Sequence, residues 1–212
     1  MMCRRFAVLL LVSTLAACAG AGDRDEVSPP PEAPPTGSVY QAPGGAFEVV
    51  VPDLLRPGSR MFEQGSPAAG DAAAPARAAV VFTDELGRLL RVEAMTPDAD
   101  PAAVFDRLVL PALRGPSPAA SVALRERRAS PRGPVLFAVV HMPGASTVFD
   151  PATGRRADAL RGVLVFNEAG RTVILMTQEW PPEDAANAGA LPPRAELLWR
   201  DLVEALGAVT VK

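Results

Sequence analysis

Reactive side chains are scarce in this chain of 212 residues, which has one histidine, two cysteines and a single lysine, Lys212. Two cysteines are too few for the network of several disulfides that stabilises many small secreted domains. With no other lysine, the chain lacks the Gly-x-x-x-x-Gly-Lys loop that binds nucleotide phosphates. The formal net charge of −3 argues against the strongly basic surface that nucleic-acid binding requires. We therefore expect no nucleic-acid partner and no nucleotide cofactor.

The chain has enough apolar residues to build a core, because 49% of its residues are hydrophobic and 21% are charged. This balance is typical neither of a disordered segment nor of a protein with many membrane spans. The length fits one domain of ordinary size.

The N-terminus has the layout of a secretory signal peptide. Arg4 and Arg5 precede an apolar run, residues 6–19, that is interrupted only by Ser13 and Thr14. A run of about 14 residues covers roughly 21 Å as a helix, which is short of the ~30 Å hydrocarbon thickness of a bilayer. A buried first helix is less compatible with the run, because it is apolar on all sides and a polar, proline-rich tract follows it.

The apolar run ends in Leu15-Ala16-Ala17-Cys18, which resembles the lipobox of bacterial lipoproteins. The resemblance implies cleavage between Ala17 and Cys18, attachment of a diacylglyceryl group to the Cys18 thiol, and acylation of the freed amine with a fatty acid such as palmitate. The alternative is an ordinary signal peptide in which Cys18 is incidental. The lipobox predicts residues 1–17 as a lipoprotein signal peptide and a bilayer as the first partner of the mature chain.

Lipidation also bears on chemistry and location. The resemblance implies that Cys3 is removed with the signal peptide and that Cys18 is acylated, so the mature chain is expected to keep one histidine and no free thiol, too few ligands for the usual zinc sites. Acyl chains contribute ~0.8 kcal/mol per buried CH₂, so two or three of them anchor firmly without a polybasic segment. The residue after Cys18 is Ala19 rather than the Asp that marks many lipoproteins of the inner membrane. The resemblance thus favours the outer membrane of the cell envelope, facing the periplasm.

Residues 18–38 follow as a lipidated cysteine and a linker rich in proline, with Val27 as its one sizeable apolar residue. Such a segment cannot bury enough surface to offset its ordering entropy. It gives the domain a reach of roughly 30–60 Å from the membrane. Residues 39–212 are predicted to form a single globular domain.

Hydrophobic periodicity in that domain predicts strands that return on themselves and two helices. Asp100-Pro101 marks the start of the first helix, which Pro111 should kink or end by Leu113, and Gly207 is the expected C-cap of the second. The segment 144–160 is expected to be a loop with a turn at 150–154. The expected strands are 46–51, 79–83, 88–94, 121–128 at an edge, 135–140 in the middle of the sheet, 162–166 and 172–176, and the second helix starts near Pro193.

This order predicts an α+β fold in which helices cover an antiparallel sheet. The opening Phe47-x-Val49-x-Val51-Pro52 strand, a helix after a hairpin, a run of antiparallel strands and a closing amphipathic helix resemble the PsbP-like α/β/α sandwich over residues 46–206. A tryptophan expected shortly after Pro52 is missing. The resemblance implies an accessory or binding role rather than catalysis.

The only histidine offers one route to catalysis. His141 ends an expected strand, with Ser146 and Asp150 nearby, and the three could form a nucleophilic triad. The Gly-x-Ser-x-Gly elbow is absent and triad members usually come from separate elements, which favours a hydrogen-bonded histidine at a strand end. We expect no catalytic residues.

Acidic residues offer a second kind of site. Oxygen ligands for a metal could come from two groups that lack calcium-loop spacing and are better explained as helix caps and solvated turns. These groups are Asp98 and Asp100, and Glu179, Glu183 and Asp184. We expect no metal site.

Four arginines form the densest basic cluster and are the candidate partner-binding residues: Arg125, Arg127, Arg128 and Arg132. They could meet lipid headgroups, lipopolysaccharide or an acidic protein. Alternatively they keep an edge strand soluble, which the intervening Glu126 favours. Trp180 has the same two interpretations, as an exposed anchor for a partner or as part of the core.

These observations predict a membrane-anchored periplasmic lipoprotein that is not an enzyme and acts as an accessory or binds an envelope protein. The alternative is a small-molecule or lipid carrier with a pocket between the sheet and the helices.

Overall fold

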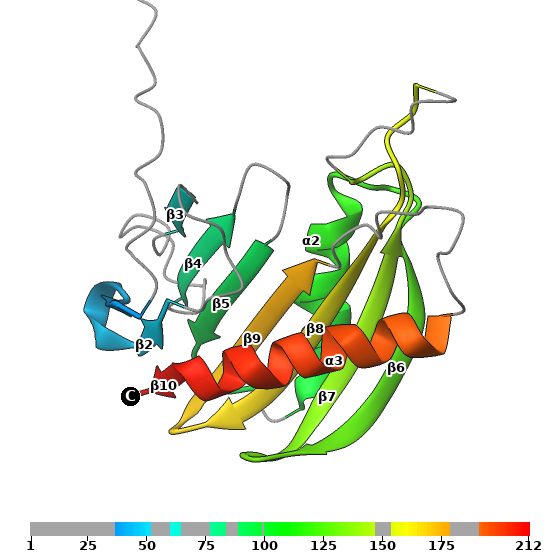
Figure 1. The fold of residues 1–212 in the computed structure, drawn as a ribbon. Coiled ribbons are helices and arrows are strands. Elements are labelled where there is room, and N and C mark those ends of the chain that lie inside the picture. Colours follow the sequence, from blue (N-terminus) through cyan, green and yellow to red (C-terminus); the bar gives the residue numbers. More distant parts are fainter. Residues whose placement is uncertain are drawn as a thin grey trace, which may run out of the picture.

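The computed structural model describes residues 37–51, 60–64, 77–83, 89–98, 100–146, 154–178 and 191–212. The predicted signal peptide, the lipidation site and nearly all of the linker lie outside these residues. Within the described ranges the chain has a mixed α+β fold built mostly from two antiparallel sheets (Figure 1).

The large sheet has seven strands in the order β3-β4-β5-β9-β8-β7-β6, and every neighbouring pair is antiparallel. The predicted hairpins are confirmed as the pairs β4–β5 and β8–β9, and the predicted edge strand is β6. The strand expected in the middle of the sheet is β7, which lies next to the edge, and β3 is an additional strand. The strands are β3 Arg60–Gln64, β4 Arg77–Thr83, β5 Leu89–Met95, β6 Ser121–Ser130, β7 Gly133–Met142, β8 Ala159–Glu168 and β9 Arg171–Gln178.

Both faces of the large sheet are buried against other elements around β7. Successive side chains of a strand point to opposite faces. In β7, Phe137 and Val139 belong to one hydrophobic cluster, whereas Ala138 and Val140 belong to a second. An apolar run on both faces is what the sequence predicts for a strand with neighbours above and below.

The C-terminal helix, α3 (Leu191–Ala208), packs on the first face. Leu198 and Leu202 are buried there, and the figure shows α3 crossing the strands β9, β8 and β7 (Figure 1). Gly162 in β8 allows this close approach, because a Cβ atom at that position would lie 2.9 Å from the Leu202 side chain. The prediction of a glycine C-cap is wrong. The helix continues past Gly207, because the chain joins a strand directly at Val209.

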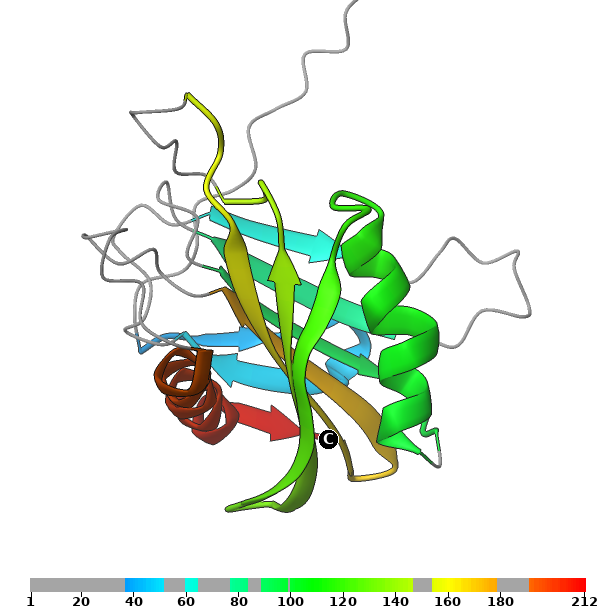
Figure 2. The same ribbon diagram turned by 90° about the vertical axis from the view of Figure 1, so that its right-hand side faces the viewer.

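Residues 101–114 form one continuous helical segment on the opposite face (Figure 2). Its parts are α1 (Pro101–Val104), the π-helical turn η2 (Phe105–Val109) and α2 (Leu110–Arg114). Asp100 caps the start as predicted, since its carboxylate accepts a hydrogen bond from the Ala102 N–H at 3.0 Å. The widened turn precedes Pro111, which has no N–H for the helical bond pattern.

A small sheet of three strands, in the order β1-β2-β10, packs on the same face as α3. Its strands are β1 (Val39–Gln41), β2 (Phe47–Val50) and β10 (Val209–Val211), and a short 3-10 turn, η1 (Pro43–Gly45), joins the first two. Tyr40 meets Phe82 of the large sheet edge to face, with ring centroids 5.8 Å apart. The predicted first strand is therefore β2, in a sheet separate from the other predicted strands. Among the helices that the structure describes, none has both the length and the apolar character that a membrane span needs.

Candidate functional site

The four predicted partner-binding arginines lie on different sides of the large sheet. Strand alternation in β6 directs Arg125 and Arg127 to the face that carries the helical segment 101–114, and Arg128 to the face that carries α3. Arg132 lies in the turn between β6 and β7. The structure therefore brings the first two together but does not form one patch from all four.

Arg125 and Arg127 each pair with an acidic residue of the helical segment or its cap. The Arg125 guanidinium donates two hydrogen bonds to the Asp106 carboxylate, at 3.0 and 3.2 Å, and lies over the Phe105 ring. A guanidinium nitrogen of Arg127 lies 3.7 Å from an Asp100 oxygen. These contacts attach the edge strand to the helical segment and neutralise both charges locally.

Arg128 and Arg132 are also paired within the chain. Arg128 donates hydrogen bonds to Glu126 and to Glu196 of α3, and the bond to Glu196 is the main cause of its raised pKa. Its guanidinium also stacks on the rings of Phe137 and Trp199, with its central carbon 4.7 and 5.1 Å from the ring centres.

Arg132 donates to the Glu168 carboxylate at 2.7 Å and to the Val209 carbonyl of β10. It thereby ties the β6–β7 turn to the small sheet. Paired in this way, all four arginines have an evident structural role.

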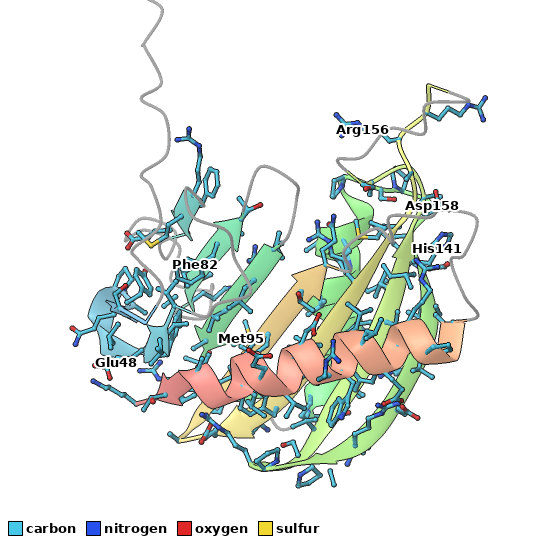
Figure 3. The ribbon with its side chains drawn as sticks, viewed as in Figure 1. Glu48, Phe82, Met95, His141, Arg156 and Asp158 are labelled. Carbon is cyan, nitrogen blue, oxygen red and sulfur yellow. The ribbon has the colours of Figure 1, made fainter. Side chains whose placement is uncertain are left out.

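His141 forms a hydrogen-bonded pair at the end of β7. Its Nε2 lies 2.8 Å from Oδ2 of Asp158, and Oδ1 of Asp158 accepts the Gly144 N–H at 3.0 Å (Figure 3). The partner is thus Asp158 rather than the Asp150 considered from the sequence, and Asp150 lies outside the described residues. Ser146 is described, and its side chain is buried. The Asp158 carboxylate thus links the end of β7 to the segment that directly precedes β8.

The Asp158 carboxylate makes a small, pH-dependent contribution to stability. The Gly144 N–H is the largest cause that lowers its pKa, and His141 adds to the effect. A lowered pKa stabilises the fold above the unfolded-state value of about 3.9, and the effect is lost as pH falls through the folded value. Asp158→Asn, which keeps an acceptor for Gly144, should cost a few tenths of a kcal/mol at pH 7, since the side chain is 56% exposed. The cost should shrink in urea titrations as the pH is lowered below the unfolded-state value of about 3.9; a cost that does not change with pH would contradict this assignment.

A buried ionic cluster lies on the large sheet, on the same face as the helical segment. Glu93 in β5 is 2% exposed and accepts hydrogen bonds from Arg77 in β4 and from Arg91, two residues away. The two carboxylate oxygens divide between the two arginines, Oε1 to Arg77 and Oε2 to Arg91. One buried negative charge thus serves two positive charges.

Arg161 in β8 lies on the same face and has no acidic partner among the described residues. It stands two residues before Val163, which is aligned with Met176, and Met176 is aligned with Arg91. Its Nη1 lies 3.7 Å from the Met176 sulfur, and its Nε is buried without a hydrogen-bond partner. Burial, followed by the charge of Arg91, lowers the pKa of Arg161. We refer to Arg77, Arg91, Glu93 and Arg161 as the arginine face.

The arginine face was not predicted from the sequence. Arg91 and Glu93 alternate with apolar residues, which is the pattern of a strand with one solvated face. A signal for it in the sequence is the charged residue Arg161, which stands between Leu160 and the apolar stretch 162–166, just before the predicted strand.

The other predicted sites are either engaged elsewhere or outside the described residues. The Asp98 carboxylate binds Arg107, and Asp100 caps α1. Within the described ranges no three His, Cys, Asp or Glu residues are grouped as a metal site. The described residues do not include Ala17, Cys18, Trp180 or the acidic group Glu179, Glu183 and Asp184.

No family model and no curated protein matches the chain. Among solved structures, the chain is similar to the Saccharomyces cerevisiae Ran-binding protein Mog1p, whose crystal structure was determined at 1.9 Å resolution. The two share 14% sequence identity with a TM-score of 0.47, over 82% of this chain and 94% of Mog1p. A likeness of this degree carries no information on activity or partners.

Proposed function

We propose that the protein is a bacterial lipoprotein, anchored through acylated Cys18 in the outer membrane, whose domain acts in the periplasm as a non-enzymatic accessory or protein-binding module. The observation that carries the proposal is the sequence Leu15-Ala16-Ala17-Cys18 directly after two arginines and an apolar run. The proline-rich linker supports it, because it provides the distance between a membrane surface and a domain. Ala19 supports the outer rather than the inner membrane.

The binding role is supported by what the polar side chains do. His141 is engaged with Asp158, and the four arginines of the β6 region are engaged with acidic side chains. These side chains hold secondary-structure elements together, as expected in a module that binds partners through its surface. We also propose that the helices complete a PsbP-like α/β/α sandwich, since α3 and the segment 101–114 pack on opposite faces of the large sheet.

Site-specific crosslinking in intact cells tests the protein-binding role. A photo-crosslinking amino acid at exposed Ala129 on the edge strand β6 should trap one reproducible envelope protein. The matched control position is Leu197 on α3, which is 46% exposed. The adduct should also disappear in the Cys18→Ser chain, because the domain is then no longer anchored in the outer membrane. Absence of an adduct, or the same adducts from both positions, would contradict the proposal.

A second candidate function, a carrier of small molecules, is favoured by one specific observation. The charged Arg161 side chain is largely withdrawn from water beside the apolar cluster under the helical segment, without an acidic partner among the described residues. A bound anionic molecule would supply that partner.

A further inference from the structure

We propose that the arginine face binds an anionic ligand, whose phosphate or carboxylate group pairs with the guanidinium groups of Arg161 and Arg91. This inference deepens the second candidate function, a carrier of small molecules, and rests on it, but it does not depend on the lipid anchor. The ligand is a small molecule, and its anionic group is the part that the site recognises.

The balance of charge on the face is the first support. Among the described residues, Glu93 is the one carboxylate that pairs with arginines of the face, and Arg161 does not contact it, which leaves the positive charge of Arg161 in excess. Arginine stays protonated at any physiological pH, so the excess cannot be removed by loss of a proton. An uncompensated buried charge is costly, and proteins normally pair such charges. An oxyanion of one or two negative charges would compensate this excess.

The position of the Arg161 guanidinium is the second support. The Arg161 Nε is buried without a hydrogen-bond partner, and among the described residues the one hydrogen bond of the guanidinium to a side chain is that of Nη1 to the weakly accepting Met176 sulfur. Its hydrogen-bonding capacity is therefore almost unused. The guanidinium group is planar and presents N–H groups in a fork that matches the two oxygens of a carboxylate or phosphate.

The surroundings strengthen such a contact. Met176 and Ile174 of β9 and Val163 of β8 belong to the apolar cluster on this face and are nearly inaccessible to solvent. Because the effective dielectric constant is low beside buried apolar groups, a charge-assisted hydrogen bond is stronger there than in water. Arg91 is held by Glu93 at 2.7 and 3.1 Å, so a second positive group is already fixed in place near Arg161.

The test uses the full chain, purified in an uncharged detergent and titrated with inorganic phosphate, with succinate, and with sodium chloride at matched ionic strength. Binding should raise the unfolding temperature with phosphate or succinate beyond the effect of chloride. It should also shift the Arg161 Nε–H resonance. A response to phosphate alone assigns a phosphorylated ligand, a response to succinate alone assigns a carboxylate, and a response to both assigns a general oxyanion site.

Arg161→Met should lower the affinity by about tenfold to a hundredfold, because charge-assisted hydrogen bonds are lost while the apolar stem is kept. Without added anion this variant should unfold at a temperature no lower than the wild type, because a buried unpaired charge is gone. The matched control is Arg127→Met, since Arg127 lies on the same face of the sheet but is 74% exposed, and it should leave the affinity unchanged. If Arg161→Met fails to fold, Arg161→Lys replaces it and should retain only part of the affinity.

Three results would overturn the proposal: a wild type that responds no more to phosphate or succinate than to chloride, equal losses in the Arg161 and Arg127 variants, or an Arg161 resonance unmoved by both anions. An unmoved Arg161 resonance would also result if a carboxylate of this chain were already hydrogen-bonded to the Arg161 guanidinium. Failure of the site is distinct from failure of the anchor, because the titration does not require Cys18 to be acylated.

Discussion

Replacement of Cys18 by serine should abolish signal-peptide cleavage, remove all fatty-acid label from the protein and deplete it from the outer-membrane fraction. The cause is chemical, because the resemblance to the lipobox implies that the thiol of Cys18 receives the diacylglyceryl group before the peptide bond after Ala17 is cut. A hydroxyl group at this position is not the substrate of that transfer. The precursor should therefore keep residues 1–17 and migrate above the mature protein on a denaturing gel.

The matched control is Cys3→Ser. Cys3 lies before the apolar run, in the segment that the proposed cleavage would remove, so its replacement should leave cleavage, labelling and fractionation as in the wild type. The membrane pellet is washed at high pH, because a short apolar run of about 14 residues holds less firmly than two or three acyl chains. Normal cleavage and fractionation of the Cys18→Ser protein would show that an ordinary signal peptidase acts here and that the cysteine is incidental.

Replacement of Glu93 by alanine should lower the free energy of unfolding by about 3 kcal/mol, the lower end of the range for breaking a buried ion pair. Glu93 is 2% exposed and is the acceptor for both Arg77 and Arg91. Its loss removes a partner of Arg77 and leaves Arg91 near Arg161 with no carboxylate paired to either among the described residues. The partial exposure of Arg77 and Arg91, at 35% and 23%, lets them recover some hydration and keeps the loss from being larger.

Urea unfolding of the Glu93→Ala and Asp106→Ala chains measures this difference. Asp106 is the control, because it also pairs with an arginine on this face of the sheet but is 52% exposed. Its replacement should cost no more than about 1 kcal/mol, as for exposed ion pairs. Phosphate should restore part of the stability of the Glu93→Ala chain if the arginine face binds oxyanions. Equal costs for the two variants would mean that Glu93 is no more than a surface partner.

Much of the large sheet could be predicted from local patterns. The hairpins β4–β5 and β8–β9 have apolar strands separated by short segments containing a glycine, and their pairing is between neighbours in sequence. The start of α1 is likewise local, since Asp100 caps the helix and Pro101 begins it. Such elements are specified by residues that lie within a few positions of one another.

The small sheet could not be predicted, because its order depends on distant residues. Val209–Val211 is only three residues long and becomes a strand by pairing with Phe47–Val49 from the other end of the domain. The same pairing explains why Gly207 does not end α3 in a glycine cap. A short apolar segment at the end of a helix carries no local signal for such a partner.

Whether a candidate site could be predicted also depends on whether its residues are close together in the sequence. The lipobox could be identified because it is a contiguous motif, whereas the arginine face joins residues from β4, β5 and β8 through strand register. The basic segment 125–132 looked like one cluster in the sequence. Strand alternation divides it between two faces, and acidic residues from η2, α3 and the α1 cap pair with three of its arginines. The partners were invisible in the sequence because they are as much as 68 positions away.

Mass spectrometry of the protein extracted from cell membranes tests the anchoring proposal most directly. We expect a mature chain of residues 18–212 whose N-terminal cysteine carries a diacylglyceryl group on sulfur and a fatty acid on its amine. Protein that begins at another residue, or that carries an unmodified Cys18, would contradict it.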